Sequence, residues 1–388
     1  MKIALVSPYD FAYPGGVTHH ITHLAQQFTE KGHQVKILAP ASKAVSDLGD
    51  RFILIGKPRP IPISGSIARI TISPWLSSRV KKVLSEEKFD IIHLHEPLVP
   101  MLCTTVLRLS KSPTMGTFHA SEARDWYDYG TPIAKFFLKK WFRKLDGKIA
   151  VSSLAKDCIC KHFPGYYNII PNGVDLKHFS PKVAPIDDFC DGKLNILFVG
   201  RLEKRKGFDY LLKAYQQVKR EIPNSRLIVV GPGIRLRHKY EKRVKRGGLA
   251  DIVFTGYVSY KDLPRYYKTA DVFCAPATGW ESFGIILLEA MAAGKPIVAS
   301  NVGGYATLIT PGVEGYLVPP KNEQALAESL IAVLKDDSLR QKMGANGRRK
   351  AQEYSWENIA QRVLDYYTSV LNESSGRGKS AKADKALA

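Results

Sequence analysis

The sequence predicts an α/β protein of two domains, each a doubly wound parallel sheet wrapped by helices. A chain of 388 residues is too long for one ordinary core, so two domains of similar size are expected. Short β-rich runs alternate with helical patterns through the first half, and the alternation begins again at Leu194. Such sheets bind ligands at the carboxyl ends of their strands, which predicts a cleft between two facing domains.

The first domain is predicted over residues 1–185. A strand at Lys2–Ser7 precedes a helix whose apolar residues share one face, namely Val17, Ile21, Leu24, Ala25 and Phe28. Further strands are expected at Val35–Ala39, Phe52–Ile55, Ile91–Leu94, Thr114–Phe118 and Lys148–Val151. Helical patterns separate several of these strands, as a parallel sheet requires.

A segment around Phe179–Gly192 interrupts the alternation with two prolines and two acidic residues, and is the expected linker. The second domain is predicted over residues 190–355. Its expected strands are Asn195–Val199, Leu227–Val230, Ile252–Phe254, Val272–Ala275, Ile297–Ala299 and Tyr316–Val318. A final helix over residues 356–372, capped by Ser355, is a candidate to cross back to the first domain. The basic tail over residues 373–388 is expected to be disordered.

Composition narrows the classes of function. The 57 Lys and Arg residues against 36 Asp and Glu give a net charge of +21, which indicates an anionic partner such as nucleotide phosphates, nucleic acid or acidic lipid. Five cysteines without a CxxC pair argue against a disulfide framework or a structural zinc site. No apolar run approaches the roughly 20 residues that span a bilayer, and the N-terminus turns polar too early for a signal peptide. A cytoplasmic protein is therefore expected.

Two loops could receive phosphate. Gly15 and Gly16 lie between the first strand and the first helix, where a helix N-terminus can bind an anion, although a plain turn explains two glycines more simply. Neither they nor Gly231–Gly233 complete a GxGxxG motif, so a nicotinamide dehydrogenase is poorly supported. The cations Arg201, Lys204, Arg205 and Lys206 follow the second domain's first strand; they suit a pyrophosphate or form a solvated basic loop.

A third motif holds two carboxylates. Glu281 and Glu289 are separated by seven residues, and Ile285–Ala292 is predicted to be a buried helix. One carboxylate then precedes the helix and the other lies about one turn inside it. Both could accept hydrogen bonds from sugar hydroxyls near free backbone N–H groups, or could serve only to complement the helix dipole.

Taken in order, these motifs resemble the GT-B fold, family-four retaining glycosyltransferases. The resemblance rests on the Glu281–Glu289 segment with Phe-Gly after its first Glu, on Pro14–Gly16, on Ile170–Asp175 and on Tyr354–Trp356, and it covers nearly the whole chain. Within the family the chain is most similar to the phosphatidylinositol mannosyltransferases, on stretches such as Gly65–Arg69 and His93–Pro97. The resemblance implies two facing Rossmann-like domains and a hexosyltransferase, with GDP-mannose as donor and a phospholipid such as phosphatidylinositol as acceptor. A UDP-sugar or another lipid or saccharide acceptor is the alternative.

The resemblance also implies the residue roles. The catalytic residues are His119, Glu281, Arg201 and Lys206. The donor-binding residues are Gly15, Gly16, Arg201, Lys206, Val258, Glu281, Phe283, Gly284, Ile285 and Glu289. The acceptor-binding residues are Tyr9, Thr18, Arg69 and His119. Arg201 and Lys206 would neutralise the diphosphate, Glu281 would orient the hexose, Glu289 would hold the ribose, and Arg69 would meet the acceptor's phosphate.

The acceptor side departs from the phosphatidylinositol mannosyltransferases at four positions. Tyr13 stands where an acid is usual, Thr18 replaces an amide, Leu98 stands for an Asn, and Ala120 stands for a Thr. The resemblance therefore defines the donor more closely than the acceptor.

No cofactor and no metal ion are expected. In the mechanism favoured for the family, the acceptor hydroxyl attacks the face that the nucleotide leaves, and its proton passes to the departing phosphate. The chain contains no Asp-x-Asp motif that would hold a metal on the diphosphate. His19 and His23 lie one helical turn apart, but sequence supplies no third ligand, so no metal site is predicted there.

Two basic segments suggest an acidic membrane surface as a partner, at the inner face of the plasma membrane. In Trp75–Leu84 the apolar residues share one side and Arg79, Lys81 and Lys82 lie away from it; Ile133–Leu145 combines aromatic with basic residues. The apolar faces could instead complete the core of the first domain. A nucleic-acid-binding protein is the other class that fits the charge, but no nucleic-acid-binding motif is present, so no nucleic acid is expected as a partner.

Overall fold

The computed structural model describes residues 1–13, 15–63, 66–73, 75–120, 132–279 and 281–386. It divides into two compact units: unit 1 comprises Met1–Asn172 and Trp356–Ala388, and unit 2 comprises Gly173–Ser355. This division differs from the predicted boundary near residues 185–190. Val174 and Phe179 lie in a core cluster of unit 2, and Arg348 Nη1 donates to the Phe179 carbonyl, so the expected linker packs as part of unit 2.

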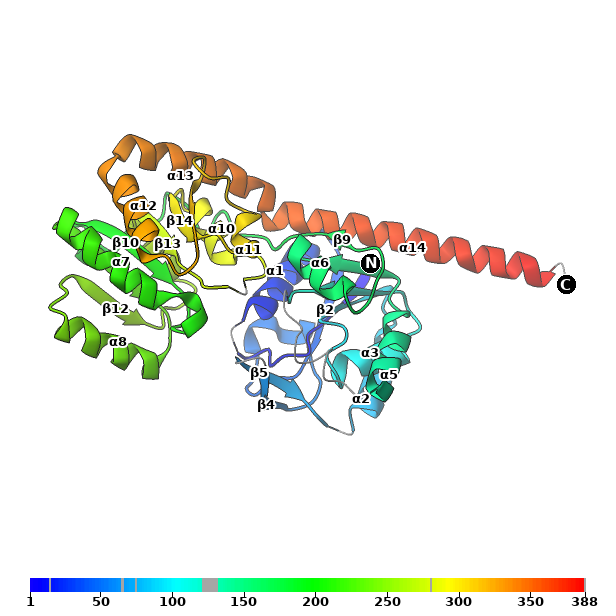
Figure 1. Ribbon diagram of the computed structural model, residues 1–388. Helices are drawn as coiled ribbons and strands as arrows, with labels where there is room; N and C mark the ends of the chain where they lie inside the picture. The colour runs from blue at the N-terminus through cyan, green and yellow to red at the C-terminus, as the bar shows by residue number, and fades with distance from the viewer. Residues whose placement is uncertain (14, 64–65, 74, 121–131, 280, 387–388) are drawn as a thin grey trace. The chain divides into compact units, whose positions relative to one another are not determined.

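Unit 1 contains a seven-stranded parallel sheet in the order β3-β2-β1-β6-β7-β8-β9. Its strands are β1 (Lys2–Val6), β2 (Gln34–Ala39), β3 (Phe52–Leu54), β6 (Ile91–His95), β7 (Thr114–Phe118), β8 (Gly147–Ala150) and β9 (Asn168–Ile169). Its helices are α1 (Gly16–Glu30), α2 (Leu76–Glu87), α3 (Leu102–Leu109), α5 (Pro132–Phe142), α6 (Ser153–Cys160) and α14 (Trp356–Ala386) (Figure 1). The short helix η1 (Ser46–Arg51) precedes β3.

Successive residues of β1 enter different core clusters of unit 1. Ile3 and Leu5 pack with α1 and α14, whereas Ala4 and Val6 pack with α2, α3 and α6. A strand buried on both faces reads as a continuous apolar run, as the strands of parallel sheets do. The predicted doubly wound sheet is therefore confirmed.

A two-stranded antiparallel hairpin, β4 (Pro58–Ile63) and β5 (Ser66–Thr71), was not predicted from the sequence. Pro58, Pro60 and Pro62 lower the strand propensity of β4, because proline cannot donate to a ladder. The hairpin matters for the site because Tyr9 forms an isolated bridge with Ile70 and Asp10 N donates to the Arg69 carbonyl.

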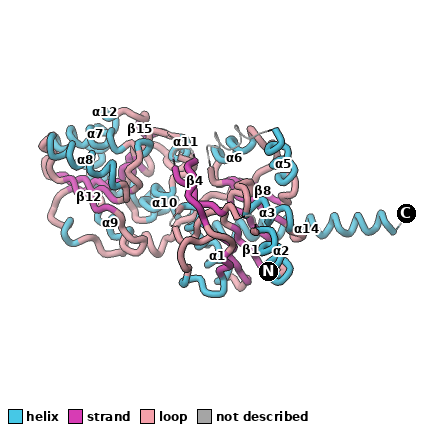
Figure 2. Tube along the Cα trace, turned by 90° about the horizontal axis from the view of Figure 1, so that it is seen from below, coloured by secondary structure: helices cyan, strands magenta, loops and turns pink. Residues whose placement is uncertain are grey.

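Unit 2 contains a six-stranded parallel sheet in the order β12-β11-β10-β13-β14-β15. Its strands are β10 (Leu194–Val199), β11 (Ser225–Val230), β12 (Ile252–Gly256), β13 (Val272–Ala275), β14 (Ile297–Ser300) and β15 (Gly315–Val318). Its helices are α7 (Phe208–Glu221), α8 (Ile234–Arg246), α9 (Leu263–Thr269), α10 (Ile285–Ala292), α11 (Gly303–Ala306), α12 (Glu323–Lys335) and α13 (Asp337–Ala351). Figure 2 shows the strands of unit 2 with helices outside them. The short helices η2 (Asp187–Phe189), η3 (Lys204–Lys206) and η4 (Gln352–Tyr354) lie in its connections.

Helix α14 belongs to unit 1, as the predicted return of the C-terminal helix requires. Its first turns pack on α1 through Trp356, Ile359 and Val363. The helix continues to Ala386, past the elements that it packs against (Figure 1), where a disordered tail from residue 373 was predicted. Once a helix is nucleated, each added residue gains one hydrogen bond, and Ala and Lys in this tail favour helix.

Candidate functional site

The basic loop after β10 is shaped by a glycine that no other residue could replace without displacement. Gly207 has φ +72, and a Cβ built there would lie 1.7 Å from the Pro276 carbonyl oxygen. The close approach joins the loop to the segment after β13, where Thr278 N donates to the Arg205 carbonyl at 2.8 Å. The loop's cations are thereby held next to the segment that carries Glu281.

Glu281 is the point where these cations meet. Its Oε1 lies 2.7 Å from Lys206 Nζ and 2.7 Å from Arg205 Nη1. The Glu281 and Lys206 side chains are almost enclosed, with 11% and 13% of their side-chain surface exposed. Burial lowers the pKa of Lys206, and the neighbouring Glu281 opposes that shift.

Arg201, the other cation that the resemblance assigns to the diphosphate, lies in the same basic loop and pairs with Glu203. Its Nε lies 3.2 Å from Glu203 Oε1, and its side chain is 55% exposed. Glu203 also accepts from Arg205 Nε at 3.0 Å, so Arg205 bridges the two acids. Sequence reasoning included Arg205 in the basic cluster but did not select it as a site residue, because the spacing alone does not show which cation turns toward Glu281.

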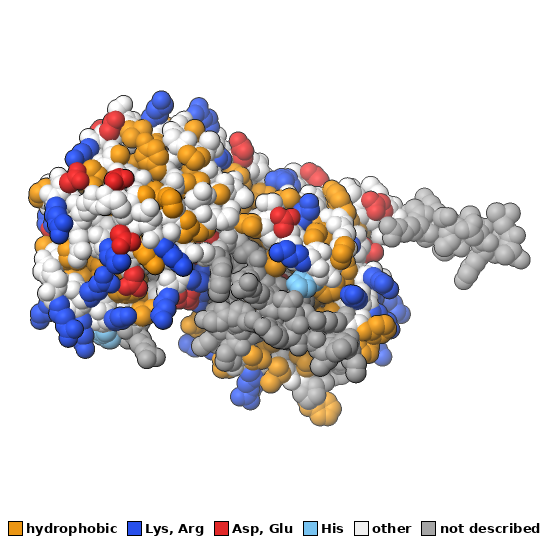
Figure 3. All heavy atoms as spheres, viewed as in Figure 1, with side chains coloured by type: hydrophobic (Ala, Val, Ile, Leu, Met, Phe, Trp, Pro, Cys, Tyr) orange, Lys and Arg blue, Asp and Glu red, His pale blue; other side chains and the backbone are white. Residues whose placement is uncertain are grey.

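A cavity of about 620 Å³ opens beside Arg205 within unit 2. Its charged lining is mostly basic: Lys204, Arg205, Lys213, Arg243, Lys321 and one acid, Asp209. Figure 3 shows Lys and Arg side chains gathered over α7 and α8 on the same unit. This face of unit 2 is suited to an anionic ligand.

Helix α10 begins directly after the Glu281 segment. Gly284 has φ +108, and a Cβ there would lie 2.9 Å from the Tyr305 ring, so both conformation and space require glycine. Phe283 is buried in the core and fixes the entry to the helix, and Ile285 is its first residue. The N-cap residue, Gly284, has no side chain that could cap the helix, and backbone N–H groups at a helix N-terminus can meet an oxygen-rich ligand.

Glu289 lies on α10 as predicted and accepts a hydrogen bond from the Tyr267 hydroxyl at 2.7 Å. Burial raises the pKa of the Glu289 carboxyl to about 7. Val258, in the loop after β12, packs against the core cluster of unit 2 that contains Phe283 and Leu287. Carboxyls whose pKa is strongly shifted by burial are found at functional sites more often than elsewhere.

Unit 1 holds the other predicted residues. Gly15 and Gly16 are exposed at the start of α1, Gly15 is the N-cap residue of that helix, and Thr18 lies in its first turn. Arg69 lies with its guanidinium 4.4 Å from the centre of the Tyr13 ring. Tyr13 therefore covers the cation that the resemblance assigns to the acceptor's phosphate.

Glu96 fixes the backbone at the end of β7. Its Oε1 accepts from His119 N at 2.7 Å and from Ala120 N at 3.0 Å. Glu96 has φ +52, which a non-glycine residue seldom adopts, and burial raises the pKa of its carboxyl to about 7. Sequence reasoning did not select Glu96, since this contact joins two strands that are distant in the chain.

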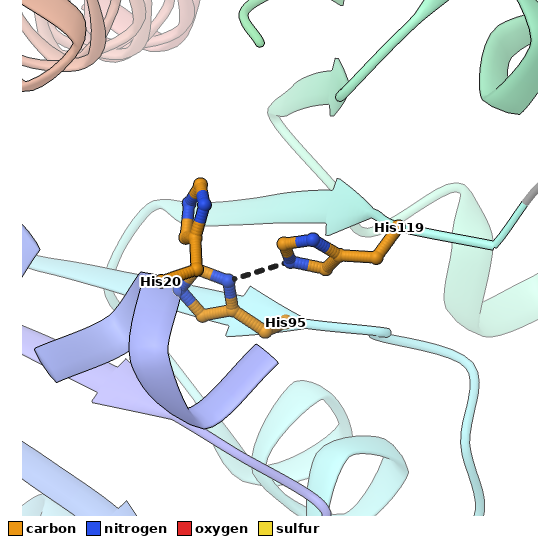
Figure 4. A group of neighbouring side chains, drawn as sticks. All are labelled: His20, His95 and His119. Carbon is orange, nitrogen blue, oxygen red and sulfur yellow. Dashed lines mark hydrogen bonds between the residues drawn. The ribbon is translucent and has the colours of Figure 1, made fainter. Parts of the chain in front are cut away.

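Three histidines from three elements come together in unit 1, as Figure 4 shows: His20 on α1, His95 at the end of β6 and His119 after β7. His95 Nδ1 lies 3.1 Å from His119 Nε2, and His20 Nδ1 lies 2.8 Å from Asn172 Oδ1. Burial lowers the pKa of His20 to about 4 and holds those of His95 and His119 well below the usual range. The imidazoles are therefore neutral at physiological pH.

The acceptor-side departures have different consequences. Leu98 is fully buried in the core of unit 1, so it cannot stand in for a polar contact to an acceptor. Tyr13 is 56% exposed and Ala120 is exposed. Tyr9 is partly buried, and burial raises the pKa of its hydroxyl, which stays protonated as a hydrogen-bond donor.

Helix α2 divides its residues between core and solvent. Leu76, Val80 and Val83 are buried, whereas Arg79, Lys81 and Lys82 are exposed. Trp75, directly before the helix, is 80% exposed, and Phe136 on α5 is 66% exposed. The apolar face thus completes the core, and the basic residues remain available to a partner. Within the described residues, no helix has both the length and the hydropathy to cross a membrane.

Comparisons with known proteins agree with this architecture. The family model of glycosyl transferases group 1 matches residues 185–350, and that of glycosyltransferase family 4 matches residues 14–178. The phosphatidyl-myo-inositol mannosyltransferase of Mycobacterium leprae is 38% identical over 97% of this chain and 98% of its own. That of Mycolicibacterium smegmatis is 36% identical over 95% and 94%. The Anabaena protein HepE, solved with UDP, shares the fold with a TM-score of 0.77 at 20% identity, over 95% of this chain and all of that one.

Proposed function

This chain belongs to the family-4 glycosyltransferases, in the group of the phosphatidyl-myo-inositol mannosyltransferases, and on that premise we propose that it transfers mannose from GDP-mannose to phosphatidylinositol. The observation that carries the proposal is the convergence of Lys206 and Arg205 on Glu281, a few residues before the N-terminus of α10. Cations and free N–H groups suit a diphosphate, and a fixed carboxylate suits sugar hydroxyls.

In the reaction, the bond from the sugar's C1 to the diphosphate oxygen breaks and a bond from C1 to the acceptor oxygen forms. The acceptor's proton passes to the departing diphosphate. Lys206, the basic loop and α10 stabilise the negative charge that develops there, and Glu281 holds the hexose in register. Glu289 accepts from the ribose hydroxyls. Because protein cations supply the positive charge, the proposed reaction needs no metal ion.

The donor assignment is tested by thermal unfolding with nucleotide-sugars, followed by release of free nucleotide with phosphatidylinositol present. A ligand at 100 times its Kd stabilises the folded protein by about 2.7 kcal/mol, so GDP-mannose should raise the Tm by several degrees. Transfer should persist in excess EDTA. If UDP-sugars stabilise the protein and GDP-mannose does not, the UDP-sugar alternative replaces the proposal. If neither does, the donor site is wrongly assigned.

Donor affinity should weaken as the pH falls through 7. The ionised Glu289 carboxylate is the stronger acceptor for ribose hydroxyls, and its pKa of about 7 means that it is protonated below that pH. The Kd of GDP-mannose should therefore rise on acidification, by at most about tenfold per pH unit. Titration calorimetry of the wild type and of Glu289→Gln checks this. The variant should bind more weakly at pH 8 and lose the dependence; an unchanged pH profile in the variant would assign the titration to another group.

The acceptor lies in a membrane, and we propose that unit 1 binds an acidic membrane surface peripherally, at the inner face of the plasma membrane. The exposed cations of α2, with Trp75 before them, support this placement. Arg69 supplies a charge for the lipid phosphate once Tyr13 moves from its guanidinium. Tyr13 in place of an acid and the burial of Leu98 require a grip on the inositol ring that differs from the one the resemblance implies.

Membrane binding should depend on α2 rather than on total charge. Each basic residue near an acidic surface contributes about 1 kcal/mol, so Arg79→Gln, Lys81→Gln and Lys82→Gln together should weaken binding to phosphatidylserine-containing vesicles roughly 100-fold at low salt. Vesicle sedimentation measures the effect. The matched control removes three exposed lysines of α8, Lys239, Lys242 and Lys245. Equal loss in the two triple variants would show non-specific attraction and contradict the role of α2.

A further inference from the structure

The histidine cluster of unit 1 has the composition of a transition-metal site. One nitrogen from each of His20, His95 and His119 lies within 4.8 Å of the others. Zinc–nitrogen bonds of about 2.0–2.1 Å place the ligand nitrogens of a tetrahedral ion about 3.4 Å apart. The 3.1 Å separation of His95 Nδ1 and His119 Nε2 is close to that value, and an ion would replace the hydrogen bond between them. The third imidazole would have to move closer from within 4.8 Å.

The surroundings orient the His20 ring and hold the backbone of His119. His20 Nδ1 contacts Asn172 Oδ1, which leaves its Nε2 for an ion; an amide or carboxylate oxygen on the second nitrogen is the usual support of a metal-bound histidine. Glu96 holds the His119 backbone through two N–H groups. Each ligand therefore arrives on a separate, fixed element, as Figure 4 shows.

His95 turns its Nδ1, the nitrogen that would bind the ion, toward His119 Nε2. Its side chain is fully buried, and its Nε2 has no hydrogen-bond partner among the described residues. His93, the adjacent histidine, is by contrast bonded at both nitrogens, to Tyr367 and to Thr117.

We propose that His20, His95 and His119 bind a divalent transition-metal ion such as Zn²⁺, and that the bound ion inhibits the enzyme. An all-imidazole donor set favours Zn²⁺, Co²⁺, Ni²⁺ or Cu²⁺ over Mg²⁺ and Ca²⁺, which prefer oxygen. Three protein ligands leave a fourth position for water. Inhibition follows from the proposed function, because the ion occupies the imidazole of His119 that the transfer reaction uses.

Binding is tested first, on the full chain freed of metal with EDTA and without reference to activity. Co²⁺ should produce the visible absorption of a low-symmetry nitrogen site, and Zn²⁺ should displace it and raise the Tm, whereas Mg²⁺ should do neither. His20→Gln should weaken Zn²⁺ binding at least tenfold. Asn172→Ala, which removes only the support of His20, should weaken it by about 10- to 100-fold.

The matched controls are His19→Gln and His23→Gln, which lie on the same helix as His20. Each should retain Zn²⁺ affinity within a factor of about two. Loss of binding in either control, with retention in His20→Gln, would assign the ion to the pair His19 and His23 and overturn the proposal. So would unchanged binding in all three variants.

Inhibition is tested second, by mannosyl transfer with added Zn²⁺. The wild type should lose activity at the Zn²⁺ concentrations that displace Co²⁺ and should regain it when EDTA is added. The remaining activity of His20→Gln should be insensitive to Zn²⁺. Metal binding without inhibition would remove the regulatory half of the proposal. Absence of transfer under all conditions, with binding intact, would count against the proposed function and leave the metal site standing.

Discussion

Replacing Glu281 by Gln should lower kcat for mannosyl transfer by about 100-fold while GDP still binds. The substitution keeps the shape of the side chain but removes the charge on which Lys206 and Arg205 converge. The two cations then lose a common anchor, and the hexose loses a charged acceptor for its hydroxyls. A misplacement of about 1 Å at a reacting centre costs about 10²-fold in rate, which sets the expected size. Steady-state kinetics and GDP calorimetry measure the two quantities separately.

Glu203→Gln is the matched control. The Glu203 carboxylate pairs with Arg201 and Arg205, and its side chain is more exposed than that of Glu281. Surface ion pairs of this kind contribute about 0–1 kcal/mol, so kcat should change by less than about fivefold. If the two variants lose activity equally, the carboxylates act only by ordering the basic loop, and Glu281 has no separate role on the sugar.

The fold could be predicted because most strands of the two parallel sheets are marked locally. The continuous apolar runs of β1 and β10, with turn residues after them, give both the element type and its place in a buried sheet. The hairpin β4-β5 could not be found this way, because Pro58, Pro60 and Pro62 argue against a strand and only the partner strand stabilises it. The unit boundary also depends on packing, since Val174 and Phe179 join the core of unit 2 from a segment whose sequence resembles a linker.

The candidate site also contains residues that the sequence identifies and contacts that depend on the folded chain. Glu281 and Glu289 belong to one short sequence motif and the cations of the basic loop to another. Spacing and resemblance could therefore identify them. The contact of Arg205 with Glu281 depends on the turn that Gly207 makes, which spacing does not specify. The histidine cluster joins residues separated by up to about a quarter of the chain. The pair that sequence favoured for inspection, His19 and His23, is adjacent on one helix face, whereas His20 turns inward to meet His95 and His119.

Replacing His119 by Ala should lower kcat by about 10²–10³ with little change in the Kd for GDP. His119 follows β7 in unit 1, and Glu96 fixes its backbone, so its ring is a positioned polar group for the reacting sugar. Removing one preorganised group that stabilises developing charge costs about this factor. GDP binds through unit 2 in the proposed function, which is why affinity should be spared.

The pH profile separates this role from that of a charged acid. Burial and the neighbouring His20 and His93 hold the pKa of His119 well below the usual range, so the ring is uncharged around neutral pH. The kcat of the wild type should therefore show no inflection near pH 6.5 that His119→Ala abolishes. His33→Gln, a substitution of a partly exposed histidine in the same unit that contacts the N-terminal amine, should retain full kcat. An inflection present in the wild type and absent only in His119→Ala would mean that the imidazole carries a proton during catalysis. Its part would then be that of a general acid or base, because a neutral hydrogen-bonding group does not titrate there.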